Sequence, residues 1–587
     1  MTGNNARLAR PPLEAGHPYA QIAAVLPEKV SKLDSADWNA KPERLRCYVM
    51  PGIVTNRTAS GLVLLALLGT YGIKQGVAQH PRAVTVQLLA INDFHGNLEP
   101  PAGADGMVNQ IPAGGAEYLA THLRDAVRDN PNSILVGAGD LMGASPLISG
   151  LFHDGPAIEA LNAMNLAVTS IGNHEMDHGP TELVHRIEGA RYQYLAANVV
   201  RTGTRGDTIL PATAVRTVGG VKIGFIGETL EGTGSLIAPQ SAQGLRFLEE
   251  SSVANAAAAR LERDGVHAIV LLIHQGGRQR PVAGPADPNG CANFEGDIKT
   301  VVSKLSPSIK VVISAHTHEF YNCTLAGHTV TSASSYGRMF TRVNLVIDFA
   351  SDTIKSVSAK NEVVTRDVTP DPVQTAIIEK YKPGAARIAD QNVGSVTGEI
   401  SRTKNEAGES AMGDVVADAQ LASTMAPENG GAEIAFMNSG GMRTGITGPA
   451  VSYDNLYTAQ PFSNQLTVHT MTGDMIRRLL EQQFKADGGV NILQVSEGFT
   501  YQYKLHATEG QHVVAGSIML HGRAVAAADM VRVEASDFLI AGGDGFTIFH
   551  EGANPIVGQV DVDALADYFR SHSPVAPGPR NRIVRVD

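Results

Sequence analysis

The chain has 587 residues, of which 43% are hydrophobic and 18% are charged. This balance supplies enough apolar side chains for large buried cores, fits two large domains, and excludes a disordered chain. The net charge of −11 excludes a protein that coats nucleic acid, because no overall positive field attracts phosphate polymers. With only 3 cysteines, a disulfide scaffold and a zinc site built from cysteine alone are also excluded.

The first predicted element is an export signal. Arg57 precedes a short apolar run at 58–73, and small residues follow shortly after it. This order is typical of a secretory signal, and the run is shorter than the ~20 residues of a membrane span. We predict that translation begins at Met50, that residues 1–49 are a non-native extension, and that 50–78 is a signal peptide of a periplasmic, secreted or cell-surface protein. The alternatives are an uncleaved anchor and a buried helix.

Export changes what is expected of the cysteines. Cleavage would remove Cys47 together with the single tryptophan, Trp38, and would leave Cys291 and Cys323. Two cysteines in an oxidising compartment favour one disulfide bond. Two buried free thiols are the alternative.

From residue 84 onward, five short apolar strands each end in a residue that can bind a metal. The strands are expected at 84–91, 133–136, 167–171, 268–273 and 310–314. Helices expected between them, at 116–128 and 253–263, make this an α/β domain. In such domains, ligand sites lie beyond the carboxyl ends of the strands.

The side chains at these strand ends are imidazoles, carboxylates and one amide, without a thiolate. They are Asp93, His95, Asp140, Asn173, His274, His316 and His318. Such ligands suit Zn, Mn, Fe, Co or Ni. Seven are too many for one tetrahedral ion, so the sequence predicts two divalent ions that share a bridge. We interpret the D-x-H and H-x-H pairs as strand alternation, which turns residues two apart to the same side.

The order of these motifs resembles the signature of calcineurin-type metallophosphoesterases. The matching blocks are Asn92-Asp93-Phe94-His95-Gly96, Gly139-Asp140, Gly172-Asn173-His174-Glu175, His274 and His316-Thr317-His318. The resemblance implies one metal held by Asp93, His95 and His318, another held by Asn173, His274 and His316, and Asp140 as the bridge. Two ions about 3.5–4 Å apart can bind a phosphoryl group, generate a hydroxide and steady the leaving oxygen.

His174 follows a predicted ligand but is not one itself. Asp177 lies three residues further on, where side chains in a helical turn are neighbours. A carboxylate there fixes the imidazole tautomer and favours its protonated form. We therefore predict that His174 stabilises transition-state charge or protonates the leaving group. The alternative is that Asp177 only caps a helix.

The second half of the chain is predicted to be another mixed α/β region. A connector with a helix at 373–381 between proline-containing flanks leads into it. Helices are then expected at 410–422, 473–483 and 562–570, and strands at 433–437, 465–470 and 530–535.

Three motifs of this half are not needed for a core. They are Asn438-Ser439-Gly440-Gly441-Met442-Arg443, Gln460-Pro461-Phe462-Ser463-Asn464 and the segment at 537–546, which places two phenylalanines around Gly542-Gly543-Asp544-Gly545. After a phosphoesterase domain, they resemble the C-terminal domain of the bacterial and animal 5′-nucleotidase family. The similarity covers roughly residues 85–549.

This second resemblance implies a set of substrate-binding residues. Phe462 and Phe538 would sandwich the nucleobase, since stacking tolerates any base. Asn438 would contact the base edge with help from Asn464, Asp544 would bind the ribose hydroxyls, and Arg443 would bind the ribose or phosphate end. Many relatives carry an arginine where this chain has Ala407-Gly408, and Arg402 is the predicted substitute.

The sequence thus predicts an α/β (α+β) fold with two domains. An N-terminal metallophosphoesterase β-sandwich flanked by helices is expected at 84–350, and a linker with a helix at 351–392. A mixed α/β substrate-binding domain is expected at 393–560, followed by a C-terminal helix and tail at 561–587.

The predicted function is that of an exported dimetal 5′-nucleotidase acting on nucleoside 5′-monophosphates, with UDP-sugars or nucleotide diphosphates as further substrates. The expected partner is a small nucleotide, with no nucleic-acid polymer and no stable membrane span. A 2′,3′-cyclic-nucleotide phosphodiesterase with 3′-nucleotidase activity is the alternative, and Asp177 favours the 5′ enzyme over it. A non-catalytic surface-binding protein conflicts with the complete ligand set, and a sulfur-oxidation hydrolase of similar fold does not need the phenylalanine pair.

Overall fold

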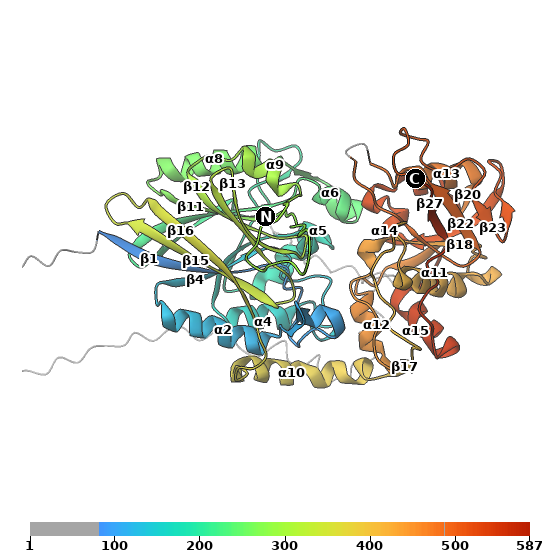
Figure 1. Cartoon of the computed structure of the whole chain (residues 1–587), viewed down its shortest axis with the longest axis horizontal. Coiled ribbons are helices and arrows are strands. Elements are labelled where there is room, and N and C mark those ends of the chain that lie inside the picture. The colour runs from blue at the N-terminus through green and yellow to red at the C-terminus, as the bar shows by residue number, and fades with distance from the viewer. Residues whose placement is uncertain (1–81, 486–487) are drawn as a thin grey trace, which may run out of the picture. The chain divides into compact units, whose positions relative to one another are not determined.

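The computed structural model describes residues 82–485 and 488–587 (Figure 1). The predicted extension, the start at Met50 and the signal peptide at 50–78 lie outside these residues, as do Trp38 and Cys47. In the part of the chain that is described, no helix combines the length and the apolar character needed to cross a membrane.

Two six-stranded sheets form the first half of the described chain (Figure 1). The first has the order β16 (Ile354–Val363), β15 (Met339–Asp348), β1 (Ala83–Ile91), β4 (Ser133–Ala138), β5 (Leu166–Ser170) and β6 (Gln193–Leu195). The second has the order β13 (Phe320–Leu325), β14 (His328–Ala333), β12 (Ile309–Ser314), β11 (Ala268–His274), β9 (Val221–Thr229) and β8 (Thr213–Val218). Strands β1, β4, β5 and β6 are parallel, and so are β9, β11, β12 and β14. The carboxyl ends of each parallel set therefore lie at one edge of its sheet.

The two sheets share one buried core, as expected of a β-sandwich. Val86 and Leu88 of the first sheet and Phe225 and Leu272 of the second belong to this core and are fully buried. Alternate residues of each strand face inward, and the residues between them face the helices. Helices α2 (Ala116–Asp129) and α4 (Gly155–Ala163) cover the first sheet, and α8 (Glu250–Arg263) and α9 (Ile298–Ser303) cover the second (Figure 1).

The second half contains a mixed five-stranded sheet with helices on both faces. Its order is β21 (Gln494–Val495), β18 (Ile434–Met437), β25 (Met530–Ser536), β20 (Gln465–Thr472) and β26 (Ala553–Val560). Helices α11 (Ala411–Thr424), α12 (Tyr453–Ala459) and α15 (Asp561–His572) pack on one face, and α13 (Gly473–Glu481) packs on the other. A small sheet follows, made of β24 (Arg523–Ala524), β23 (Met519–Leu520), β22 (Phe499–Tyr503) and β27 (Ile583–Arg585).

The other elements are short. The helices are α3 (Leu147–Gly150), α5 (Gly179–Arg186), α6 (Thr233–Leu236), α7 (Pro239–Ala242) and α14 (Asp537–Ile540). The strands are β2 (Met107–Val108), β3 (Ile111–Pro112), β7 (Val199–Arg201), β10 (Leu245–Phe247), β17 (Asn392–Gly394) and β19 (Val451–Ser452).

The connector helix is longer than the sequence predicts. Helix α10 (Pro372–Ala389) continues through Pro383, which the sequence analysis assigns to a flank. Asp371 caps its start by accepting two backbone N–H groups of the first turn. Ile377 and Ile378 are buried in the core beside α2 and α4. This packing outweighs the ~3 kcal/mol that an internal proline costs.

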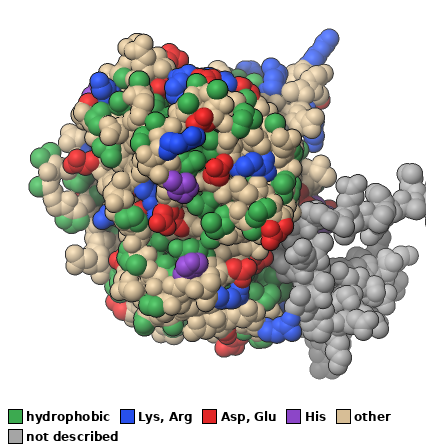
Figure 2. Space-filling view, turned by 90° about the vertical axis from the view of Figure 1, so that its right-hand side faces the viewer, with side chains coloured by type: hydrophobic (Ala, Val, Ile, Leu, Met, Phe, Trp, Pro, Cys, Tyr) green, Lys and Arg blue, Asp and Glu red, His purple; other side chains and the backbone are tan. Residues whose placement is uncertain are grey.

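On the face of the molecule that Figure 2 draws, acidic and basic side chains are interspersed. Ion pairs on the surface, such as Arg478–Glu551 at 2.6 Å and Arg523–Asp529 at 2.8 Å, are largely exposed. Exposed pairs contribute at most about 1 kcal/mol each. The charge therefore bears on solubility rather than on the fold.

A disulfide bond joins Cys291 to Cys323, which confirms the predicted pair. Cys323 lies on β13 and is buried, whereas Cys291 lies in the long loop after β11. Gln279 of the same loop donates to the main-chain oxygen of Phe320 at 2.9 Å. The bond and this contact fasten the loop that follows His274 to the second sheet.

We expect the substitution Cys323→Ser to lower the stability of the oxidised protein. The bond joins residues 32 positions apart, and closing such a loop removes about 3–4 kcal/mol of denatured-state entropy. Calorimetry should show a lower unfolding temperature for this variant, and the wild type in reductant should show the same loss. Thr324→Ser, a change at the exposed neighbour of Cys323 on β13 that keeps the pair, is the control. An unfolding temperature unaffected by both treatments would show that the bond does not stabilise the protein.

Candidate metal centre and its surroundings

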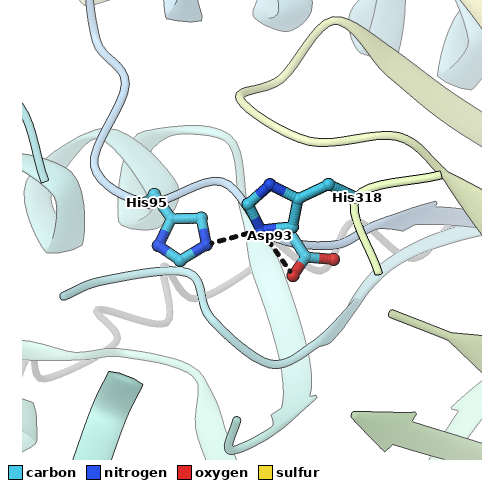
Figure 3. Close-up of side chains that lie close together, drawn as sticks. All are labelled: Asp93, His95 and His318. Atoms are coloured by element: carbon cyan, nitrogen blue, oxygen red, sulfur yellow. Dashed lines mark hydrogen bonds and ion pairs between the residues drawn. The ribbon is translucent and has the colours of Figure 1, made fainter. Parts of the chain in front are cut away.

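Loops at the carboxyl ends of five strands bring the predicted ligands together. Asp93 and His95 follow β1, Asp140 follows β4, Asn173 follows β5, His274 ends β11, and His316 and His318 follow β12. Within residues 82–485 and 488–587, two groups of side chains could each hold an ion, with ligand atoms within 4.8 Å of one another. One group is Asp93, His95 and His318, and the other is Asp140, His274 and His316. Figure 3 shows the first group, in which side chains from the two loops point toward one another.

Asp140 lies within reach of both groups. Its Oδ2 is 3.0 Å from His274 Nε2 and 3.6 Å from His95 Nε2. The bridging role of Asp140 stays a prediction. Asn173 lies with the second group, because its Oδ1 is 3.1 Å from His316 Nδ1.

The chemistry of these side chains fits two metal ions. His274 Nε2 is buried and, although it is close to Asp140, no hydrogen-bond partner satisfies it among the described residues. Desolvation lowers the pKa of His95 and His318, and it lowers the pKa of His316 to about 3. For His274, burial acts in the same direction, but Asp140 and Asp93 outweigh burial and raise the pKa to about 9. Neutral imidazoles bind metals, and together with carboxylates they suit first-row divalent ions.

The interpretation of the D-x-H and H-x-H pairs as extended strand is wrong. Asp93, His95, His316 and His318 have φ angles of 48°, 47°, 73° and 58°. Both strands end before these pairs begin, and each pair lies in a turn of left-handed residues. Asp, Asn and His adopt this conformation more readily than most residues. The turns, rather than strand alternation, direct each pair toward the centre.

Glu175 ties two of the ligand loops together. Its buried carboxylate accepts backbone N–H groups from Gly172 at 2.6 Å, Asp140 at 2.9 Å and Leu141 at 2.8 Å. Met142 donates to it as well, at 3.3 Å. The sequence analysis leaves Glu175 outside the functional set, although its place directly after Asn173 and His174 is the signal that could have found it.

Further contacts orient the imidazole rings of the first group. His95 Nδ1 is 2.8 Å from the main-chain oxygen of Gly143, and this leaves Nε2 for a metal. The ring of Tyr336 meets His95 and His318 edge-on, with centroids 5.8 Å and 5.3 Å away. The backbone N–H of Tyr336 donates to Asp93 O at 2.7 Å. No motif in the sequence points to Tyr336.

His174 and Asp177 are in the contact that the sequence predicts. His174 Nδ1 is 2.9 Å from Asp177 Oδ2, across the 3₁₀ turn η2 (His174–Met176). Asp177 caps neither this turn nor α5 with its side chain. Burial lowers the pKa of His174, but Asp177 and Asp140 outweigh burial and raise it. The contact favours a proton on Nδ1, which can donate to the Asp177 carboxylate.

Two predicted substrate residues lie beside these groups. Arg443 Nη2 is 3.3 Å from His95 Nε2. The ring of Phe462 stacks on His174, with centroids 5.5 Å apart and planes 28° apart. Arg443 also lies 6.0 Å from the centre of the Phe462 ring.

A second cluster forms around Asp544. Asn438 Nδ2 donates to Asp544 Oδ2 at 2.8 Å, and Asn491 Nδ2 donates to the same oxygen at 3.4 Å. Asn491 is not among the predicted site residues, because no motif in the sequence marks it. The ring of Phe538 rests against Gly543, where a Cβ atom would approach it to 2.5 Å. Any larger residue at this position would therefore force the ring to move.

The remaining two predicted substrate residues are engaged elsewhere. Asn464 Nδ2 donates to Asp561 Oδ2 at 3.1 Å, and the N–H of Asp561 donates to Asn464 O at 2.9 Å. Arg402 donates to the main-chain oxygen of Arg443. Asn464 thus anchors the turn after Phe462, and Arg402 supports the segment that carries Arg443.

Residues 86–320 match the calcineurin-like phosphoesterase family, and residues 391–551 match the 5′-nucleotidase C-terminal domain family. The chain is 30% identical to cell wall protein Lmo0130 of Listeria monocytogenes over 538 residues, which cover 83% of this chain and 67% of that protein. It is 27% identical to endonuclease YhcR of Bacillus subtilis over 532 residues, which cover 87% of this chain and 42% of that protein. The chain thus spans less than half the length of the endonuclease.

Among solved structures, a 5′-nucleotidase precursor from Thermus thermophilus superposes with a TM-score of 0.72. The alignment covers 86% of this chain and 100% of the other, at 23% sequence identity. This likeness shows a shared fold across both halves of the described chain.

We expect Glu175→Gln to weaken metal binding. An amide oxygen accepts fewer hydrogen bonds than a carboxylate, so some of the buried N–H groups of residues 140–142 and 172 would lose their partner, at about 1–3 kcal/mol each. Loss of such a supporting contact typically lowers metal affinity about 10–100-fold. Metal content after dialysis against a buffered divalent ion, measured by elemental analysis, checks this expectation. Glu188→Gln, an exposed change, is the control, and equal metal content in both variants would contradict the role of Glu175.

Proposed function

Because the chain belongs to the 5′-nucleotidase family of phosphoric ester hydrolases, we propose that it hydrolyses nucleoside 5′-monophosphates to nucleoside and phosphate outside the cytoplasm. The observation that carries this proposal is the contact of Arg443 and Phe462 with His95 and His174. It joins residues suited to a nucleotide with residues suited to phosphoryl chemistry. The names of the cell wall protein and of the 5′-nucleotidase precursor support the location and the substrate.

The metal ions are part of the proposal. Asp93, His95 and His318 would hold one, Asn173, His274 and His316 would hold the other, and Asp140 would contact both. Bound divalent ions neutralise charge on the phosphoryl group and lower the pKa of bound water.

His174 would act on the leaving group. Asp177 holds the proton on Nδ1 and favours the charged imidazole, so Nε2 carries a second proton. Donation from Nε2 to the ribose 5′ oxygen would neutralise the alkoxide as the P–O bond breaks. The neutral imidazole would then regain a proton from solvent.

Arg443 and Phe462 would bind and orient the nucleotide. The guanidinium group offers a planar fork of N–H donors that suits a phosphate oxygen, and among the described residues Arg443 has no carboxylate partner that would occupy it. The Phe462 ring gives a base a stacking surface worth about 1–3 kcal/mol. Asn438 and Asp544, already bonded to each other, would meet the base edge and the ribose hydroxyls.

We expect AMP to be hydrolysed with a higher kcat/KM than 3′-AMP, 2′,3′-cyclic AMP or UDP-glucose. Phosphate release by the full chain with added Mn²⁺ or Zn²⁺ measures this. Chelation should abolish the activity, and a divalent ion should restore it, because the ligand set suits such ions. A preference for the cyclic compound would support the 2′,3′-cyclic phosphodiesterase instead, and no hydrolysis at all would support a binding protein.

We expect His174→Ala to lower kcat about 10²–10⁴-fold, the usual contribution of a positioned acid. Metal content should stay as in the wild type, because His174 is not among the predicted ligands. Asp177→Asn should have a smaller effect in the same direction. His185→Ala, a change at an exposed histidine of α5, is the control. Unchanged turnover in His174→Ala would remove this residue from the mechanism.

A further inference from the structure

Arg338 lies at the edge of the candidate metal centre, in a segment that the sequence analysis does not mark. It ends the connection from β14 to β15, where Ser334, Tyr336 and Gly337 all have positive φ angles, of 62°, 61° and 65°. The guanidinium carbon of Arg338 is 5.4 Å from the centre of the Tyr336 ring. The same ring meets the rings of His95 and His318, so Tyr336 connects Arg338 to the first group of ligands.

The guanidinium group of Arg338 is held in place by neutral acceptors alone. Nε donates to Ser335 O at 3.1 Å, Nη2 to Ser335 Oγ at 2.7 Å, and Nη1 to Met107 O at 3.3 Å. A guanidinium group has five N–H donors, so two remain beyond these three contacts. Arg338 is partly exposed, and solvent or a ligand can therefore reach them.

No carboxylate forms an ion pair with Arg338 among the described residues. Burial lowers the pKa of Arg338, and the charges of Tyr336, Asp105 and Glu319 offset only part of this effect. Arg342, four residues further along on β15, differs in this respect, since it lies 3.1 Å from Glu362 and 3.4 Å from Asp129. A partly buried cation without a counter-ion is costly, so the position of Arg338 indicates an anionic ligand.

Other unpaired cations lie around the same centre. Arg443 contacts His95, and Arg402 donates to the main-chain oxygen of Arg443. Neither forms an ion pair with a carboxylate within the described part of the chain. One phosphate bound by two metal ions and Arg443 does not need the charge of Arg338 as well.

We propose that Arg338 binds a second phosphate of the substrate, next to the phosphate held at the candidate metal centre. Arg338 is then a specificity-determining residue for nucleotides that carry two linked phosphates. The inference rests on the proposed function for the identity of the first phosphate. The fixed plane of the guanidinium, set by Ser335 and Met107, suits two oxygens of a phosphate group.

Kinetics on ADP and AMP test the assignment. In Arg338→Gln, kcat/KM should fall at least about tenfold more for ADP than for AMP, since a charge-assisted hydrogen bond is worth a tenfold change or more. Arg338→Lys keeps the charge but loses the planar pair of N–H donors. Its ratio of kcat/KM for ADP to kcat/KM for AMP should therefore lie between the ratios of Arg338→Gln and the wild type. Arg342→Gln, on the adjoining strand β15, should leave the ratio of kcat/KM for ADP to kcat/KM for AMP unchanged.

If Arg338→Gln leaves the ratio of kcat/KM for ADP to kcat/KM for AMP unchanged, the proposal is overturned. Equal losses on the two substrates would then assign Arg338 to the fold or to the first phosphate. Calorimetric binding of inorganic pyrophosphate and inorganic phosphate to the full chain separates this proposal from the proposed function. Suppose that no nucleotide is hydrolysed, but pyrophosphate binds more tightly than phosphate and this difference in affinity disappears in Arg338→Gln. The second phosphate site is then supported, and the proposed function is not. If the advantage is absent or independent of Arg338, the site is excluded.

Discussion

Four backbone N–H groups converge on the buried carboxylate of Glu175, and the geometry of the candidate metal centre depends on this convergence. The donors belong to the loops after β4 and β5, which carry Asp140 and Asn173. Without the carboxylate, these donors would be buried and unpaired, and each would cost about 1–3 kcal/mol. With it, one carboxylate holds both loops together, which favours a preorganised set of ligands.

The sequence predicts the sheet and most of the centre because parallel strands place their carboxyl ends together. Asp140 and His274 lie at the ends of strands of different sheets, so the rule places each at the edge of its own sheet, and the packing of the two sheets on one core brings them within 3.0 Å. This rule about the ends of parallel strands does not predict contacts that turns make. Tyr336 meets Asp93 from a distant part of the sequence, and its left-handed backbone has no local signature. The continuation of α10 through Pro383 is likewise not predicted from the sequence, because the packing of the helix, rather than its helix propensity, decides it.

The two halves of the chain contribute different chemistry to one place. The first half supplies the histidines and carboxylates, and the second supplies Arg443 and Phe462. A resemblance to a family identifies such residues one by one but does not show their contacts. The stacking of Phe462 on His174 is a contact that the resemblance does not show. The hydrogen bond from Asn464 to Asp561 is another, and it engages Asn464, which is predicted to assist at the base.

The left-handed backbone at Asp93, His95, His316 and His318 bears on how substitutions at these positions are read. Aspartate and histidine accept this conformation readily, whereas alanine does so less well. An alanine scan would therefore remove a ligand and also strain the turn that presents the neighbouring one, and the two losses would be counted as one. Asparagine and glycine keep the turn with much less strain. Replacement by these residues separates the contribution of the side chain from that of the backbone.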